Sequence, residues 1–117
     1  MNITEYGKEI RKWRLDNGVG FTKFTEAVCL SKSTVSGMER SSDKLTKTSF
    51  QRVMASINFN NRDRARLYDA YWLTKHPEYW DEDDSIEDRY IIASILRRVR
   101  NKEISLKDLV WEGWKYV

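Results

Sequence analysis

The stretch from Phe21 to Arg40 constrains the fold most strongly, because apolar residues recur there at intervals of three and four on both sides of a tight turn. This spacing places the apolar groups of each segment on one side of a helix. We therefore expect two short helices that share a core, built on Phe24, Ala27, Val28, Leu30, Val35 and Met38.

The second of these helices carries small polar residues on its remaining face. Ser31 stands where it can cap the free backbone N–H groups. Ser, Thr and Gly form helices less readily than the Glu and Lys that a merely solvated face would more often contain. Short hydroxyls and a bare Gly allow a helix to approach the floor of a DNA groove closely, and a Lys supplies a long donor to guanine or phosphate. The outward residues are Lys32, Ser33, Thr34, Ser36 and Gly37.

Residues 6–41, YGKEIRKWRLDNGVGFTKFTEAVCLSKSTVSGMERS, resemble the helix-turn-helix domain of the phage repressor, Cro and Xre family. The match needs no gap and is carried by Gly7, Ile10, Arg11, Arg14, Gly18, Ser31, Ser33, Val35, Ser36, Glu39 and Arg40. The resemblance implies an all-α, repressor-like five-helix bundle that binds a palindromic operator in double-stranded DNA as a dimer. It also implies an ion pair between Arg14 and Glu39 beneath the recognition surface.

Helix-turn-helix geometry indicates which residues would touch DNA. The N-terminal end of the recognition helix enters the major groove while the preceding helix crosses the backbone, and dimers bind half-sites about one helical turn apart. Base contacts are expected from Lys32, Ser33, Thr34, Ser36 and Gly37. Phosphate contacts are expected from Thr22, Lys23, Arg40, Lys44 and Lys47. Simple solvation is the alternative for the lysines, and helix capping is the alternative for Ser33.

The single cysteine, Cys29, stands where members of the resembled family usually have the glycine of the turn. If this residue takes a positive φ, its side chain costs on the order of 1 kcal/mol. One cysteine excludes an internal disulfide, and with one histidine no Cys/His metal cluster can form. We expect Cys29 to be a buried small apolar residue, and we predict no metal and no cofactor.

Further helices are expected on both sides of this pair. Thr4 can cap a first helix that ends near Asp16, before an Asn-Gly pair. Thr48 or Ser49 is expected to cap a fourth helix. Its inward residues would be Phe50, Val53, Met54 and Ile57.

A fifth helix is expected over residues 61–75, and His76-Pro77 should end it. Its inward residues would be Leu67, Ala70 or Tyr71, and Leu73 or Thr74. The five helices would form a DNA-binding domain over residues 1–77.

The acidic stretch EYWDEDD, residues 78–84, is expected to be a linker at a domain boundary. Beyond it, residues 85–101 have the spacing of an amphipathic helix. Ser105 can cap a last helix with Leu106, Leu109, Val110 and Trp114 on one side. Because the five-helix bundle would be complete without them, we predict that residues 85–117 form a helical extension that makes the dimer. The expected interface residues are Ile92, Ile95, Leu96, Val99, Trp111 and Trp114.

The charge is unevenly distributed. Residues 1–80 hold 14 Lys and Arg against 9 Asp and Glu, whereas residues 81–117 hold 7 against 9. The basic part contains the predicted reading helix. No Gly-rich phosphate loop, nucleophile elbow or metal-ligand spacing occurs in the sequence, so we do not expect an enzyme. No apolar run approaches the roughly eighteen residues of a membrane span, which favours a cytoplasmic location.

Two functions remain open at this point. The first is a sequence-specific transcriptional regulator, as a repressor of phage or mobile-element type, that occupies its operator as a homodimer. The second is an antitoxin-like protein-interaction module whose C-terminal part neutralises a toxin. The two are not exclusive.

Overall fold

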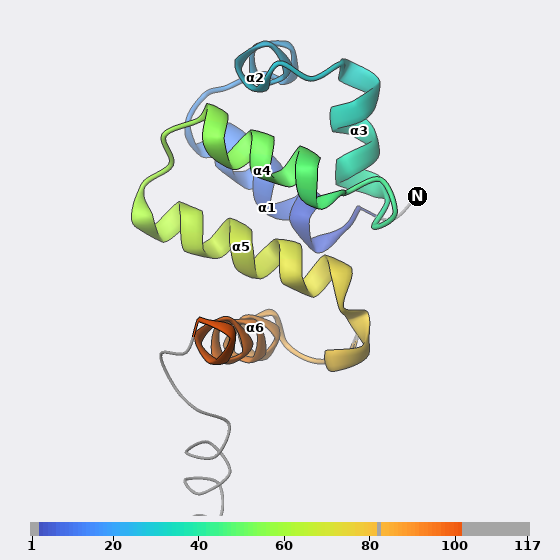
Figure 1. Cartoon of the computed structure of the whole chain (residues 1–117), viewed down its shortest axis with the longest axis vertical. Coiled ribbons are helices and arrows are strands. Elements are labelled where there is room, and N and C mark those ends of the chain that lie inside the picture. Colours follow the sequence, from blue (N-terminus) through green and yellow to red (C-terminus); the bar gives the residue numbers. More distant parts are fainter. Residues whose placement is uncertain (1–2, 82, 102–117) are drawn as a thin grey trace, which may run out of the picture.

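The computed structural model describes residues 3–81 and 83–101, which form α-helices and one short 3₁₀ turn but no β-strand (Figure 1). The elements are α1 (Glu5–Asp16), α2 (Phe21–Val28), α3 (Lys32–Arg40), α4 (Lys47–Ser56), α5 (Asn61–Lys75), the 3₁₀ turn η1 (Pro77–Tyr79) and α6 (Ile86–Arg100). The all-α prediction is confirmed for these residues. The predicted last helix lies outside the described residues, and with it Ser105, Leu106, Leu109, Val110, Trp111 and Trp114.

The helices follow one another along a long axis, with α2 and the start of α3 at one end and α6 at the other (Figure 1). In the middle, α1 packs chiefly against α5. α3 leans on α1, and α6 packs on α5 from the opposite side. The principal axes measure 51 × 30 × 25 Å. As a consequence, the surfaces of α2 and α6 face opposite ends of the molecule.

Side-chain caps mark the start of five helices. A side-chain oxygen accepts a hydrogen bond from a backbone N–H three residues further on at Thr4, Ser31, Thr46, Asn60 and Ser85. The prediction of Thr48 or Ser49 as the cap of α4 was wrong, because the helix begins one residue after Thr46. Thr46 and Ser49 each accept a bond from the other's backbone N–H, at 3.1 and 3.2 Å. This capping box satisfies two N–H groups at once and therefore favours the earlier start.

The main core lies among α1 to α5. The predicted apolar residues Phe24, Val28, Val35, Met38, Phe50, Val53, Met54, Leu67, Ala70 and Leu73 are buried, and Leu30 and Ile57 are half-buried. Ala27 is exposed, contrary to the prediction. α2 instead buries Thr25, whose hydroxyl donates to the Thr22 carbonyl at 2.7 Å and so needs no other partner. The spacing of apolar residues did not predict the burial of Thr25, because a threonine whose hydroxyl is hydrogen-bonded can take the place of an apolar residue.

The start of α1 and the end of α3 approach each other closely at Gly7. A Cβ on Gly7 would collide with the carbonyl oxygen of Glu39. The same carbonyl accepts hydrogen bonds from the backbone N–H and the hydroxyl of Thr4, both at 3.0 Å. Glycine at position 7 therefore allows α3 to be bonded directly to the first turn of α1.

α6 docks on α5 through a second, smaller core. This cluster consists of Ala70, Leu73, Tyr90 and Ala93, with Trp80 packed against it. The Trp80 indole N–H donates to the Leu73 carbonyl at 2.8 Å. Residues 78–84 were predicted to be a linker, and within this stretch Trp80 packs against α5.

Charged contacts also hold α6 in place. Arg89 Nη1 lies 3.0 Å from Glu5 Oε1, and Arg97 Nε lies 3.1 Å from Asp69 Oδ1. The Tyr90 hydroxyl donates to Glu9 Oε2 at 3.2 Å. The side of α6 that faces the bundle is therefore partly polar. The spacing of apolar residues in the sequence does not identify such a face.

The apolar stripe predicted on α6 is only partly covered by the bundle. Ile92, Leu96 and Val99 are half-buried, and the side chain of Ile95 is 36% exposed. Ile91, next to this stripe, is 55% exposed. Among the residues that the structure describes, no helix is both long enough and apolar enough to cross a membrane.

Candidate nucleic-acid interface

A left-handed residue makes the turn between α2 and α3. Cys29 has φ 57° and ψ 40°, and it is the one non-glycine residue with positive φ in the described part of the chain. The expected strain at this position is therefore present. The prediction that Cys29 is buried was wrong, because it follows the last turn of α2 at the surface and its side chain is exposed.

A group of hydroxyls covers the start of α3. Ser31 Oγ accepts from the backbone N–H of Thr34 at 3.1 Å and lies 2.7 Å from the Thr34 hydroxyl. The Ser33 hydroxyl lies 3.3 Å from the same oxygen. Ser31 rather than Ser33 is thus the cap, and the alternative role for Ser33 is not needed. The Thr34 hydroxyl makes the shorter of these two contacts within the protein, and the Ser33 hydroxyl is the more weakly held.

The outward residues of α3 differ in how far they are exposed. Lys32, Ser33 and Thr34 are exposed, whereas Ser36 and Gly37 are half-buried. Gly37 lies beneath the side chain of Lys44, since a Cβ there would come within 2.8 Å of Lys44 Cδ. The missing side chain at Gly37 therefore makes room for Lys44, a use that the sequence did not indicate.

Glu39 is the one carboxylate of α3, and it is buried, with 1% of its surface exposed. The predicted partner Arg14 lies 3.2 Å from Oε1 and 3.4 Å from Oε2 through Nη2. A second arginine, Arg11, donates from Nε to Oε1 at 2.7 Å and was missed. The two arginines stand three residues apart on α1 and therefore lie on the same face of the helix. This spacing is the sequence signal that could have indicated the second contact.

The neighbourhood of Glu39 also affects Tyr6. Burial raises the pKa of the Tyr6 hydroxyl well above its ordinary value, and the negative charge of Glu39 raises it further. Tyr6 is thus neutral, and its backbone N–H donates to the Thr74 hydroxyl at 2.9 Å. The bond between Tyr6 and Thr74 joins α1 to α5, so α3 packs against an α1 that is itself attached to α5.

The residues predicted to contact phosphate are all exposed. They are Thr22, Lys23, Arg40, Lys44 and Lys47. Gly20 provides no side-chain cap for α2, so the first N–H groups of that helix have no side-chain partner. Such groups, with the helix dipole, favour anions. From position 22 to 47, five exposed Lys and Arg are accompanied by two exposed carboxylates, Glu26 and Asp43.

The one histidine of the sequence, His76, has structural partners outside this face. The His76 ring stacks on Trp72 at 3.9 Å between ring centres, and its Nδ1 lies 3.1 Å from Glu78 Oε1. Within residues 3–81 and 83–101, no three His, Cys, Asp or Glu side chains are grouped so that they could hold a metal ion. No family model, curated protein or solved structure matches the chain. Its function is therefore inferred from its own residues.

Proposed function

We propose that this chain is a sequence-specific regulator that binds double-stranded DNA through a helix-turn-helix formed by α2, the Cys29 turn and α3. The observation that carries this proposal is the face at the start of α3. It presents Lys32 and Ser33 to solvent, and the only carboxylate of the helix, Glu39, is buried near the other end of α3. A reading helix needs such a narrow, uncharged or basic face to enter the major groove.

Lys32 is the residue proposed to read a base. Its ammonium group can donate to guanine O6 and N7, whereas the hydroxyl of Ser33 can donate to or accept from any base edge. The rigid base for this reading is the attachment of α3 to α1 through Glu39, Arg11 and Arg14. A fixed helix reduces the freedom that is lost on binding.

Two groups of phosphate contacts would flank the reading helix. Thr22 and Lys23 lie at the uncapped start of α2, while Arg40, Lys44 and Lys47 lie at or beyond the end of α3. Contacts of this kind set the register of a protein on DNA without reading its sequence. Occupation of an operator by such a protein would block transcription.

We propose that the regulator is a homodimer joined through the outward face of α6. This face has exposed isoleucines at Ile91 and Ile95, flanked by half-buried Ile92, Leu96 and Val99. Because α6 and the start of α3 lie at opposite ends of a molecule 51 Å long, this dimer would hold its reading helices far apart (Figure 1). The half-sites would then be separated by more than the roughly 34 Å of one helical turn, in contrast to the one-turn spacing expected from the sequence.

Selection of bound sequences from random duplex DNA tests the proposal, and two lysine variants sharpen it. Lys32→Ala should weaken binding to the selected site by about 1–3 kcal/mol and relax the preference at one base pair of each half-site. Lys44→Ala should weaken binding to selected and scrambled duplexes alike. If the selection recovers no preferred sequence, or the two variants lose the same affinity on both duplexes, the proposed reading by α3 is wrong.

A further inference from the structure

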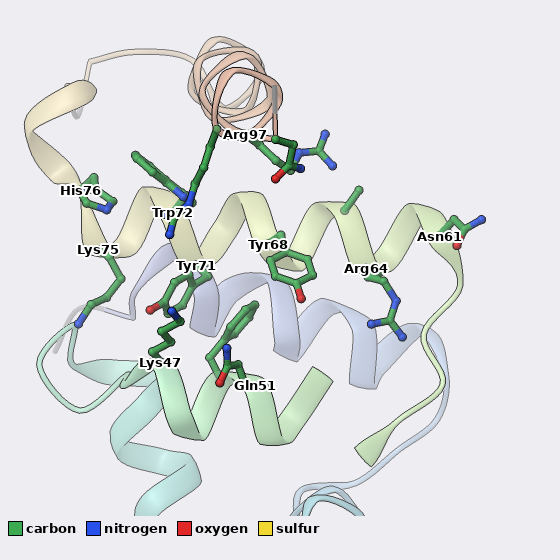
Figure 2. A pocket seen from close by; sticks show the side chains of 14 residues that line it. Lys47, Gln51, Asn61, Arg64, Tyr68, Tyr71, Trp72, Lys75, His76 and Arg97 are labelled. Atoms are coloured by element: carbon green, nitrogen blue, oxygen red, sulfur yellow. The ribbon is translucent and has the colours of Figure 1, made fainter. Parts of the chain in front are cut away.

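A groove of about 660 Å³ runs along α5 between α4 and α6 (Figure 2), and Lys47, one of the proposed phosphate contacts, lies at its edge. Figure 2 shows Tyr68 and Tyr71 reaching from α5 toward α4, while Arg97 reaches from α6 toward α5. This volume lies in the range of roughly 300–1,000 Å³ that is typical of sites for small organic ligands.

Aromatic rings form the floor of the groove. Tyr71 is stacked on Phe50, with 4.2 Å between ring centres and 17° between the ring planes. Tyr68 meets Phe50 edge to face at 5.2 Å. Trp72 lines the groove from the α6 side of α5 (Figure 2). Because Phe50 is buried, the two tyrosines are held in fixed orientations at the surface. Rings held in this way favour a flat ligand, which can stack on them with little loss of freedom.

The rim of the groove is strongly basic. Five of its lining residues are Lys or Arg, and none of the described residues that line it is Asp or Glu. Two of the five are already engaged: Lys75 Nζ donates to the Ser42 carbonyl at 2.8 Å, and Arg97 pairs with Asp69. Lys47, Arg64 and Arg100 make no ion pair with any described residue.

The Arg100 charge reaches the aromatic floor. Burial raises the pKa of the Tyr71 hydroxyl, and the positive charge of Arg100 opposes this rise. Arg100 and Tyr71 both line the groove, so this charge adds to the positive potential around the rings. Uncompensated charges of one sign around a concave surface concentrate ligands of the opposite sign.

We propose that this groove is a binding site for a small aromatic anion, a flat ring system that carries a carboxylate or a phosphate. The ring stacks beside Tyr68 and Tyr71, and the acidic group binds at the basic rim, where Arg64 and Arg100 are the arginines without an ion pair. Arginine suits this task because its planar group donates two parallel hydrogen bonds to a carboxylate or phosphate. The site does not depend on whether α3 binds DNA.

Calorimetric titration of the full chain tests the proposal with naphthoate, naphthyl phosphate, neutral naphthylmethanol and acetate. Naphthoate or naphthyl phosphate should bind saturably with one site per chain, and the tighter of the two identifies the preferred acid. Naphthylmethanol should bind at least about tenfold more weakly, because it lacks the charge-assisted hydrogen bonds. Acetate, which has no ring, should give no measurable heat of binding.

A pair of arginine variants locates the site. Arg64→Gln combined with Arg100→Gln should weaken the binding of the aromatic acid by tenfold or more, whereas Arg52→Gln should leave it unchanged. Arg52 is the matched control, because it is an exposed arginine of α4 that does not line the groove. Circular dichroism of each variant would confirm equal helicity. Absence of saturable binding, equal affinity for naphthoate and naphthylmethanol, or an equal loss in the control would overturn the proposal.

Discussion

Arg11 Nε lies 2.7 Å from Oε1 of Glu39, and this contact ties the buried end of α3 to the middle of α1. Arg14 reaches the same carboxylate from the next turn of α1, so that one anion on α3 is shared by two cations. The carboxylate is almost fully buried, whereas Arg11 keeps 39% of its side chain in solvent. The orientation of α3 thus depends on a carboxylate that has almost no access to water.

Glu39→Gln is expected to destabilise the chain by about 3 kcal/mol, because breaking a buried ion pair leaves the remaining charges without compensation. Urea unfolding followed by circular dichroism measures this change. Glu26→Gln, an exposed carboxylate of α2, is the control and should change stability by less than about 0.5 kcal/mol. Equal effects of the two substitutions would show that Glu39 does not hold α3 in place.

Cys29→Gly is expected to stabilise the chain by about 1 kcal/mol, because glycine adopts a positive φ without the steric penalty of a side chain. Cys29→Ala should have almost no effect, since alanine retains the Cβ that causes the penalty. The same urea titration compares the three proteins. A Gly variant no more stable than the Ala variant would contradict the left-handed turn at this residue.

Asp69 should make the docking of α6 depend on pH. Burial raises the pKa of this carboxyl from its ordinary 3.8 to about 6, although Arg97 and Arg66 oppose the rise. Folding therefore favours the protonated form. The stability that this group provides is complete below about pH 4 and is lost as the pH rises through about 6.

Asp69→Asn removes this titration and isolates its effect. The stability of the natural chain relative to the Asn variant should fall by about 2 kcal/mol between roughly pH 4.5 and pH 7.5. Urea unfolding of both proteins at the two pH values measures it. The difference in unfolding free energy between the two proteins could instead stay constant, or change in favour of the unsubstituted chain as the pH rises. Either result would mean that the ion pair with Arg97 outweighs the effect of burial on Asp69.

Ile95→Glu is expected to convert a dimer into a monomer without loss of helicity, because a charge would then lie in the proposed α6 interface. Sedimentation equilibrium measures the mass of each protein. Ile86→Glu is the control, since Ile86 is exposed on a different side of α6. If the unsubstituted chain sediments as a monomer, the proposed homodimer is wrong. The α6 face would then be available to a different protein, as in an antitoxin-like module.

The elements with local signals were predictable from the sequence. Thr4 and Ser31 begin α1 and α3 as expected, because a capping side chain bonds to N–H groups only two or three residues away. α5 ends before His76-Pro77 for a similar local reason, since proline disfavours a helical residue before it. The pair of Arg14 and Glu39 was expected from family resemblance rather than from spacing.

The features that the sequence did not reveal depend on contacts between distant segments. The inner face of α6 contains Tyr90 and Arg97, whose polar ends have partners on α1 and α5. The spacing of apolar residues therefore indicated the outer face of α6 as the contact surface instead. The aromatic groove is likewise formed by three helices, and no periodicity within one segment indicates a surface shared among them.

The most direct test of DNA binding by α3 is the salt dependence of affinity on the selected duplex, measured by fluorescence anisotropy with the full chain. About four phosphate contacts per subunit predict that log K falls with log salt at a slope of about −7 for a dimer. Lys23→Ala and Lys47→Ala should each reduce the magnitude of this slope, by about two per dimer. A slope near zero would contradict the account, because a protein that releases no counterions from DNA makes no phosphate contacts.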